Sequence, residues 1–283
     1  MMQILRTVAE LHHWSRTLRA AGGNAIGLVP TMGALHEGHA SLIRAARADC
    51  AHVAVSLFVN PTQFGPHEDF ARYPRSFEAD CRLAEVAGAD MLFAPAVEDL
   101  YPNGAESTFV DVPVLSDRLD GASRPGHFRG VATVVAKLFL AAEPDRAYFG
   151  QKDAAQVAVL RRMTVDLRLA TEIVVCPIVR DAEGLALSSR NAYLAPAERV
   201  QALVLSRAVR RVASLVAEGE RRATMLLAAA HGVFAAEPEV RVDYMALVDW
   251  ATLKPVEIAV PGTLFAVAAW VGTTRLIDNA ILP

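Results

Sequence analysis

The feature that most constrains the fold is an alternation of short apolar segments with longer amphipathic ones over residues 25–179. Apolar runs of strand length occupy residues 25–30, 53–59, 91–94, 147–149 and 172–179. Segments with helical periodicity separate them, at residues 38–50, 76–88, 130–142 and 154–167. Strands that alternate with helices pair in parallel and are covered on both faces. The pattern therefore predicts an α/β fold, a Rossmann-like doubly wound parallel sheet.

The pattern changes after Asn191. Two long helical segments rich in Ala and Arg follow at 196–218 and 221–236, and two strand-like segments come after them at 242–248 and 263–271. This order predicts a smaller α+β C-terminal domain. We expect the boundary near residues 181–190, with a Rossmann-like domain over 1–185 and a C-terminal lid domain over 186–283.

Composition excludes several classes of protein. The 28 Lys+Arg and 31 Asp+Glu give a net charge of −3, which argues against a general binder of nucleic acid or anionic membranes. Three widely spaced cysteines suggest neither a disulfide framework nor a zinc knuckle. Residues 1–14 carry charges where a signal peptide needs an apolar run, and Lys137 interrupts the apolar run at 131–142. We expect a cytoplasmic chain that does not span a membrane.

The loop after the first of these strands holds the residues best suited to chemistry. It reads P-T-M-G-A-L-H-E-G-H over residues 30–39, and a predicted helix begins near Gly38. Ligands of parallel sheets collect where strands end and the next helix presents free amide hydrogens. The glycines allow close backbone approach, and His36 and His39 can face the same phosphate group. The loop is therefore a candidate phosphate site.

Other sites fit this loop less well. A dinucleotide fingerprint needs G-x-G-x-x-G, which is missing, and a P-loop needs Lys and a hydroxyl where this chain has His39 and Ala40. A zinc site would need a third ligand, and no neighbouring Cys or His offers one at the usual spacing. If the H-x-x-H motif stood alone, the alternative would be two surface or core histidines without a ligand.

Further strings accompany the loop: F-V-N-P-T-Q-F at 58–64, S-R-P-G-H-F-R-G at 123–130, G-Q-K-D-A-A-Q at 150–156 and L-S-S-R-N at 187–191. H-x-G-H resembles the signature of the nucleotidylyltransferase superfamily. The longer V-P-T-M-G-A-L-H-E-G-H, with the four strings in the same order, resembles the pantothenate synthetase (pantoate–β-alanine ligase) family. The resemblance covers about residues 26–194, and the late A-A-W-V-G-T-T-R-L-I-D-N extends it nearly to the end.

The resemblance implies an AMP-forming ligase of pantothenate biosynthesis. Pantoate's carboxylate would attack the α-phosphate of ATP and release pyrophosphate, and the amine of β-alanine would then displace AMP from pantoyl adenylate. The first step needs no base, because a carboxylate is already ionised at neutral pH. It needs alignment and compensation of charge on the phosphates. The family also implies a homodimer, Mg²⁺ bound mainly through ATP phosphates, and nucleotide and pantoate binding by the large domain.

Site residues carried over from the family fall into two groups. The ATP-binding group is Met32, Gly33, Ala34, Leu35, His36, Glu37, Gly38, His39, Gly150, Gln151, Lys152, Asp153, Val179, Leu187, Ser188, Ser189 and Arg190. Within it, the catalytic residues at the phosphates would be His36, His39, Lys152, Ser188, Ser189 and Arg190, with His39 as a proton donor. Pantoate would be held by the neutral amides of Gln63 and Gln156, with Asn60 as a helper.

Each of these residues also has a purely structural interpretation. Asn60 precedes Pro61 and could open a turn, the S-S-R-N string could cap a helix near Pro196, and Gln156 could lie on a solvated helix face. Taken singly these interpretations are favoured, and the five strings in family order reverse the balance. Arg124, His127 and Arg129 are expected in the pocket or at an interface.

One residue departs from the family pattern: Gln151 stands where the family usually has Glu, so a role that needs a carboxylate there is in doubt. The protein ligands of the metal stay open, with Asp80 and Asp153 as candidates. Two other functions also stay open. One is an H-x-G-H adenylyltransferase for a different small acid or phosphate, which would not need Gln63 and Gln156, and the other is a non-catalytic ATP-binding relative.

Overall fold

The computed structural model describes residues 2–22, 25–66, 68–104 and 107–283. Its large sheet has six parallel strands in the order β1-β4-β3-β2-β5-β6. Their bounds are Gln3–Leu5 for β1, Ile26–Thr31 for β2, His52–Leu57 for β3, Met91–Phe93 for β4, Arg146–Gly150 for β5 and Glu172–Cys176 for β6. The central strands are buried almost throughout, as their apolar sequences require. The predicted parallel sheet is confirmed.

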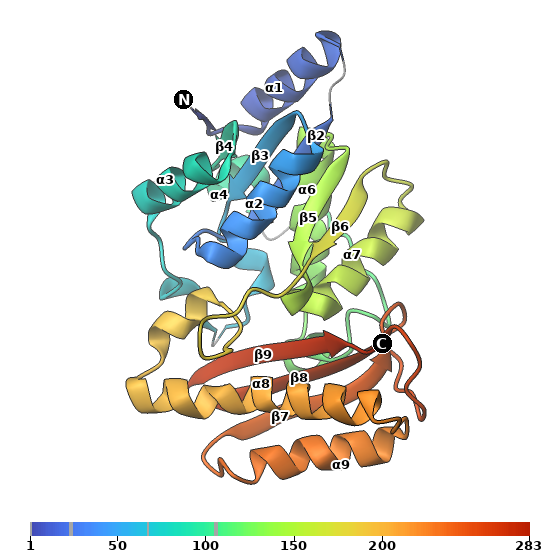
Figure 1. The fold of residues 1–283 in the computed structure, drawn as a ribbon. Coiled ribbons are helices and arrows are strands. Elements are labelled where there is room, and N and C mark those ends of the chain that lie inside the picture. The colour runs from blue at the N-terminus through green and yellow to red at the C-terminus, as the bar shows by residue number, and fades with distance from the viewer. Residues whose placement is uncertain (1, 23–24, 67, 105–106) are drawn as a thin grey trace.

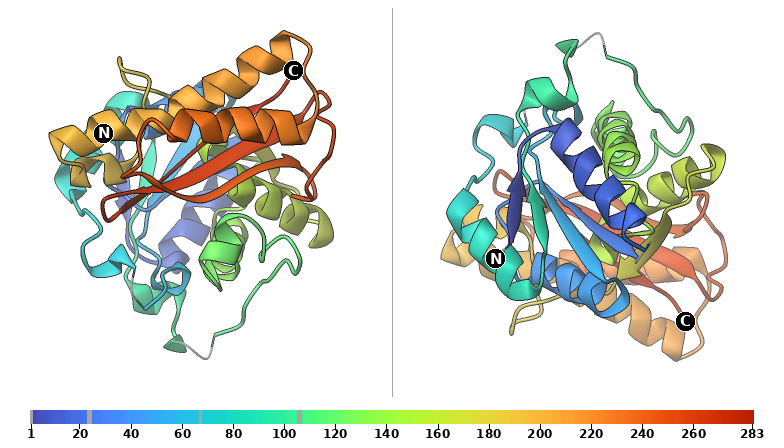
Figure 2. Two further views of the ribbon diagram at one scale, coloured as in Figure 1. Left: turned by 90° about the horizontal axis from the view of Figure 1, so that it is seen from below. Right: turned by 90° about the horizontal axis from the view of Figure 1, so that it is seen from above.

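Helices cover both faces of this sheet (Figures 1 and 2). One face carries α2 (Glu37–Asp49) and α3 (Phe77–Ala87), and the other carries α1 (Val8–Ala20), α6 (His127–Ala142) and α7 (Ala154–Asp166). Short helices α4 (Val97–Leu100) and α5 (Asp120–Ser123) lie in the connection before α6. The chain leaves β2 in one direction and β5 in the other, so the sheet is doubly wound with its switch point between β2 and β5.

The C-terminal part contains an antiparallel sheet of β7 (Arg241–Asp249), β8 (Thr263–Val271) and β9 (Thr274–Ile281). Helices α8 (Pro196–Ala217) and α9 (Ala223–Phe234) pack on one face and form a core of their own with it. Side chains of the other face, such as Leu264 and Ala266, join the core of the large unit. The sheet therefore lies against the end of the parallel sheet where its strands finish (Figure 1).

Several elements differ from the sequence prediction. The strand expected over 172–179 ends at Cys176 because Pro177 follows, and proline has no N–H to donate to the ladder. Strands β1 and β9 and helix α1 were not predicted. No helix among the described residues is long and apolar enough to cross a membrane. The expected division into domains at 185/186 stays a prediction.

Candidate active site

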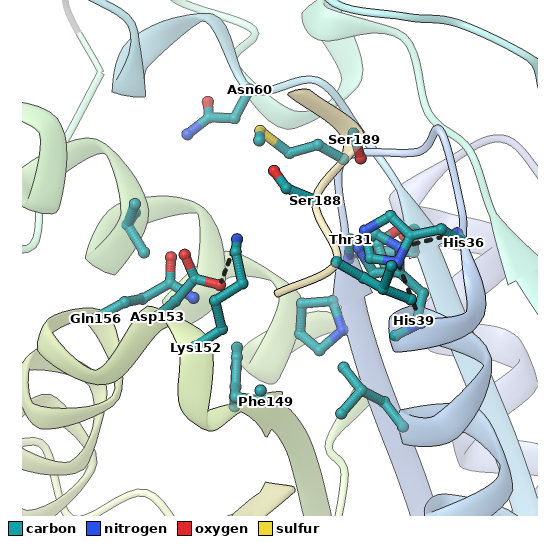
Figure 3. Close-up of a pocket in the computed structure, with 18 of the residues that line it drawn as sticks. Thr31, His36, His39, Asn60, Phe149, Lys152, Asp153, Gln156, Ser188 and Ser189 are labelled. Atoms are coloured by element: carbon teal, nitrogen blue, oxygen red, sulfur yellow. Dashed lines mark hydrogen bonds and ion pairs between the residues drawn. The ribbon is translucent and has the colours of Figure 1, made fainter. Parts of the chain in front are cut away.

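A cavity of about 200 Å³ lies at the carboxyl ends of β2 and β5. The loop after β2 ends at His36, the N-cap of α2, and the first turn of α2 carries His39. The turn η4 (Gln151–Asp153) after β5 carries Lys152. The S-S-R-N string forms the turn η5 (Ser189–Tyr193) and reaches the same cavity. Figure 3 shows Lys152, Asp153 and Gln156 on one side, His36 and His39 on the other, and Ser188 between them. The switch point thus collects motifs from three distant parts of the chain.

Most predicted site residues line this cavity: Met32, His36, Gly38, His39, Asn60, Gln63, Gly150, Lys152, Asp153, Gln156, Val179, Leu187, Ser188, Ser189 and Arg190. Gly33, Ala34 and Leu35 lie in the same loop outside the lining. Glu37 points to solvent and forms an ion pair with Arg44 at 2.7 Å. The Gln151 side chain is turned toward β9, where its Nε2 donates to the Asn279 Oδ1 at 3.1 Å.

In both His36 and His39 the ring Nδ1 accepts a hydrogen bond from a backbone N–H. The His36 Nδ1 accepts from the backbone N–H of Gly38 at 3.1 Å, and the His39 Nδ1 accepts from the N–H of His36 at 3.3 Å. Burial, followed by the charge of Lys152, lowers the pKa of His36 to about 4. Burial, then the neighbouring His36, lowers the pKa of His39 well below its usual value. Both rings are therefore neutral at pH 7, with the proton on Nε2 as a hydrogen-bond donor.

Asp80 supports the histidine loop from α3. Its Oδ2 accepts from the Ala34 N–H at 2.9 Å, and its Oδ1 accepts from the Leu35 N–H at 2.8 Å and the Ser76 hydroxyl at 3.0 Å. Ala34 has a φ of 50°, a left-handed conformation that costs free energy for a residue with a Cβ. The buried carboxylate offsets this cost and fixes the loop.

The pantoate candidates differ in how much hydrogen-bonding capacity they keep. Asn60 is 1% exposed, and its Nδ2 donates to the Gln63 Oε1 and the Gly130 carbonyl, both at 3.1 Å. Its Oδ1 accepts from Thr62 and Tyr101. Gln63 keeps capacity toward the cavity, because among the described residues its side chain forms one other hydrogen bond, a weak one from Nε2 to the Met32 Sδ. These contacts favour Asn60 as a residue that orients Gln63.

Two arginines beside the cavity are held by consecutive carboxylates. Arg190 forms a bidentate pair with Asp69, at 2.9 Å for both bonds, and the Arg124 Nε donates to Glu68 at 2.8 Å. Burial alone would raise the pKa of Asp69, but the hydrogen bonds and charge of Arg190 outweigh it and lower that pKa. Both pairs are thus ionised, and each arginine keeps N–H groups for an anionic substrate.

Arg124 and His127 line a second cavity of about 60 Å³ that shares Lys152, Gln156 and Arg190 with the first. The His127 Nε2 lies 3.0 Å from the Arg124 Nη1, and its Nδ1 lies 2.9 Å from the Gln63 carbonyl. Burial and the Arg124 charge lower the pKa of His127 to about 4, so the ring is neutral. Arg129, expected in the pocket or at an interface, lines neither of these two cavities and packs over the Phe109 ring at 4.9 Å.

Sequence reasoning missed the apolar wall of the cavity. This wall comes from α6 and β5 and consists of Val131, Val134, Val135, Leu138 and Phe149. The α6 residues recur at the spacing of one helix face, which in a sequence looks the same as a stripe that packs into the core. Missed residues of the smaller cavity come from α5 and β9, including Asp120 and Arg275. The late string with T-R-L-I-D-N was the available signal for Arg275.

Comparisons with known proteins agree with this geometry. Residues 3–281 match the family model described as pantoate-beta-alanine ligase. The chain is 60% identical over 291 residues to pantothenate synthetase of Acidobacterium capsulatum, covering 99% of this chain and 97% of that protein. It is 55% identical over 281 residues to that of Koribacter versatilis, covering 99% and 96%.

Solved structures give the same result. Pantothenate synthetase from Thermus thermophilus superposes with a TM-score of 0.93 at 47% identity, covering 100% of both chains. Pantoate-beta-alanine ligase from Francisella tularensis, in complex with "Beta-gamma ATP" and β-alanine, gives a TM-score of 0.82 at 32% identity, covering 99% and 98%. On the fold, the pocket and these matches together, the chain belongs to the pantoate–β-alanine ligase family.

Proposed function

We propose that this chain condenses pantoate with β-alanine in two steps within the cavity at the β2/β5 switch point. A pantoate carboxylate oxygen bonds to the α-phosphorus of ATP as the bond to the β-phosphate oxygen breaks, which gives pantoyl adenylate and pyrophosphate. The amine of β-alanine then bonds to the acyl carbon, AMP leaves with the electron pair of the acyl–oxygen bond, and the amine loses a proton. The observation that carries the proposal is one cavity that joins phosphate donors to two neutral amides.

The roles follow from the contacts. The His36 and His39 Nε2–H groups and the Lys152 ammonium donate to phosphate oxygens, because negative charge moves from the α-phosphate toward the pyrophosphate during adenylation. His39 thus donates a hydrogen bond and keeps its proton. Ser188, Ser189 and Arg190 complete the nucleotide side, and Gln63 and Gln156 bind pantoate.

The smaller cavity suits the second substrate. The Francisella relative binds β-alanine, and in this chain the cavity next to the main pocket is lined by Arg124, Arg190 and Arg275. An arginine there can hold the carboxylate of β-alanine while the amine points into the shared space near Gln156. Because the two cavities adjoin, the amine of β-alanine in the smaller one can attack an adenylate formed in the main one.

Mg²⁺ fits this site as a companion of ATP. No group of three or more His, Cys, Asp or Glu side chains that could hold a metal is found among residues 2–22, 25–66, 68–104 and 107–283. Asp80 lies behind the histidine loop, while Asp153 lines the cavity with its side chain 47% exposed. Asp153 would contact a metal that is bound mainly by phosphates and water, and Mg²⁺ would there neutralise phosphate charge.

Three further parts of the proposal rest on family membership. We expect two copies to form a homodimer, a cytoplasmic location, and a C-terminal lid domain over 186–283. Light scattering of the purified chain checks the first, since a monomer mass at micromolar concentration contradicts it.

Isotope exchange between ATP and pyrophosphate tests the reaction. Exchange is expected to require pantoate but not β-alanine, because the adenylate forms before the amine acts. Measured AMP release should require all three substrates. Exchange without pantoate, or exchange that appears only with β-alanine, contradicts the two-step reaction. Exchange with another small acid in place of pantoate supports a different adenylyltransferase, and no exchange with any acid supports a non-catalytic relative.

A further inference from the structure

The turn η4, which carries Lys152, is hydrogen-bonded by a side chain of the C-terminal sheet. Asn279 lies in β9 and is 3% exposed. Its Nδ2 donates to the backbone carbonyls of Gln151 and Lys152, at 3.0 and 2.9 Å. Its Oδ1 accepts from the Gln151 Nε2 at 3.1 Å. Both donors and one acceptor site of this amide are therefore spent on one turn of the large unit.

A second donor of the C-terminal part binds the next helical turn. The Trp250 Nε1 donates to the Ala154 carbonyl at 2.9 Å, and Arg161 lies over the Trp250 ring at 4.6 Å. Local side chains provide no cap, since the residue before the turn is Gly150 and the Asp153 side chain forms no capping bond to α7. The backbone around Lys152 is thus fixed by residues that lie 96 to 128 positions away in the sequence.

Gln151 is matched to this arrangement. Asn279 already uses both of its N–H groups on carbonyls, so its oxygen must face the residue 151 side chain. A glutamine supplies a donor there. An ionised glutamate would place a carboxylate oxygen against the Asn279 oxygen, with no proton between them. The Gln151 side chain therefore serves the contact with β9 rather than the cavity.

We propose that Asn279 is a positioning residue for adenylation, which acts through Lys152, with Trp250 as a weaker second one. Lysine is a flexible side chain on four carbons, so the place its ammonium can reach depends on where its backbone is anchored. Figure 3 shows Lys152 reaching from its turn into the middle of the cavity. A small displacement of the turn moves the ammonium away from the phosphates, and misplacement of about 1 Å can cost on the order of 100-fold in rate.

The inference rests on the proposed adenylation and predicts a loss of rate rather than of substrate binding. Asn279→Ala should lower the single-turnover rate of adenylate formation about 30-fold, with half-saturating pantoate and ATP within about threefold of the parent. Trp250→Phe keeps a ring and removes the N–H donor, and it should lower the rate about fivefold. An Asn279→Ala chain that is folded and adenylates within about threefold of the parent overturns the inference. If Asn279→Ala does not fold, the adenylation rate is measured in Trp250→Phe instead, and an unchanged rate in that variant overturns the inference.

A double-mutant cycle separates positioning from a general structural effect. In a Lys152→Ala background, Asn279→Ala should lower the residual rate by less than about threefold, because it acts through the missing ammonium. A full loss of about 30-fold more in that background overturns the inference. Thr263→Val is the matched control, since it removes a buried hydroxyl in β8 of the same sheet, which accepts from the Val260 N–H. It should lower stability and leave the adenylation rate unchanged.

Amide hydrogen exchange of the ligand-free chain keeps this inference apart from the proposed function. Asn279→Ala should speed exchange over residues 150–156 and leave residues 36–43 of the other wall unchanged. If the parent shows no pantoate-dependent isotope exchange between ATP and pyrophosphate, the proposed function fails. Faster amide hydrogen exchange in Asn279→Ala would still show that Asn279 holds the turn at residues 151–153. Unchanged amide exchange over residues 150–156 overturns it.

Discussion

At the scale of single residues, the cavity combines a flexible type of side chain, Lys152, with donors that hydrogen bonds hold in place. Arg190 is held by Asp69, and the two histidines are neutral, while the Lys152 ammonium lies 3.9 Å from Asp153, beyond hydrogen-bond distance. Its side chain is 21% exposed. Lys152 is therefore the charged group best placed to follow the phosphate oxygens as charge shifts during adenylation.

Lys152→Arg tests whether position 152 needs more than a positive charge. Of the 28 cationic residues 25 are arginines, so a lysine here is notable. A guanidinium is longer and needs a planar set of acceptors, so we expect normal folding, ATP binding within a few-fold, and about a 100-fold slower adenylation, about 2.7 kcal/mol at the transition state. Rapid-quench measurement of adenylate formation checks this. Exposed Lys254→Arg is the control, and a Lys152→Arg rate within about threefold of the parent contradicts the prediction.

The amides of Gln63 and Gln156 give a second prediction at this scale. Gln63→Ala and Gln156→Ala should each weaken pantoate binding by about 1–3 kcal/mol and ATP binding much less, because removal leaves polar groups of a small acid unpaired. Calorimetric titration with each substrate measures both effects. Gln201→Ala, which removes an amide bound to Glu239 in the C-terminal part, should change neither. Equal losses for pantoate and ATP would mean that the glutamines shape the whole cleft.

At the scale of elements, the sequence predicted those helices and strands whose local hydrophobic pattern is sufficient to identify them. Buried parallel strands are continuous apolar runs, so the alternation over residues 25–179 was enough for the sheet. Helix α1 could also have been found, because Thr7 and Glu10 form a capping box that the sequence displays as T-x-x-E. Strand β9 could not, since Asp278 and Asn279 interrupt its apolar pattern. These polar residues are buried because they bind residues of the large unit. Such tertiary contacts leave no signal in the local sequence pattern.

The same limit applies to the candidate site. Motif strings located the loops, but the hydrogen bonds of Asn60 and of Asp80 became visible only in three dimensions. Asp80 occupies a helix first turn, where a carboxylate is common for reasons unrelated to any ligand. Its two loop contacts join residues 45 and 46 positions apart. The sequence therefore suggested Asp80 as a candidate metal ligand, whereas its contacts indicate that it supports the loop.

Asp80→Asn tests that support. An amide at this position turns an NH₂ group toward one of the two loop N–H donors, so we expect a loss of about 1–3 kcal/mol in stability. Because the loop carries the histidine donors, the KM for ATP should also rise about 10-fold, while that for β-alanine stays near the parent value. Asp99→Asn is the control, since Asp99 accepts from the Val8 N–H at the start of α1, away from the cavity. Unchanged KM for ATP in folded Asp80→Asn contradicts the assigned role.

At the scale of the whole molecule, the two sheets meet around a site that holds three half-buried, neutral histidines. His36, His39 and His127 all have a pKa lowered by burial, to about 4 for His36 and His127. In the unfolded chain each would titrate near 6.5. Below that pH the unfolded chain takes up protons that the folded chain does not, so the free energy of unfolding must fall as the pH falls. The ion-paired carboxylates Glu68 and Asp69 add to this fall only at lower pH, because their pKa values are lowered from 4.5 and 3.8.

The window between about pH 4.5 and 6.5 therefore reports the histidines, with a slope of at most about 1.4 kcal/mol per pH unit for each ring. Urea unfolding of the ligand-free chain at several pH values should show stability that rises with pH through this window. His127→Gln keeps polar atoms and removes one titrating ring, so the slope should decrease by about one third, whereas exposed His231→Gln should leave it unchanged. Stability that is level from about pH 4.5 to 6.5 would show that the folded chain takes up these protons as readily as the unfolded chain, which contradicts the lowered pKa of the three rings.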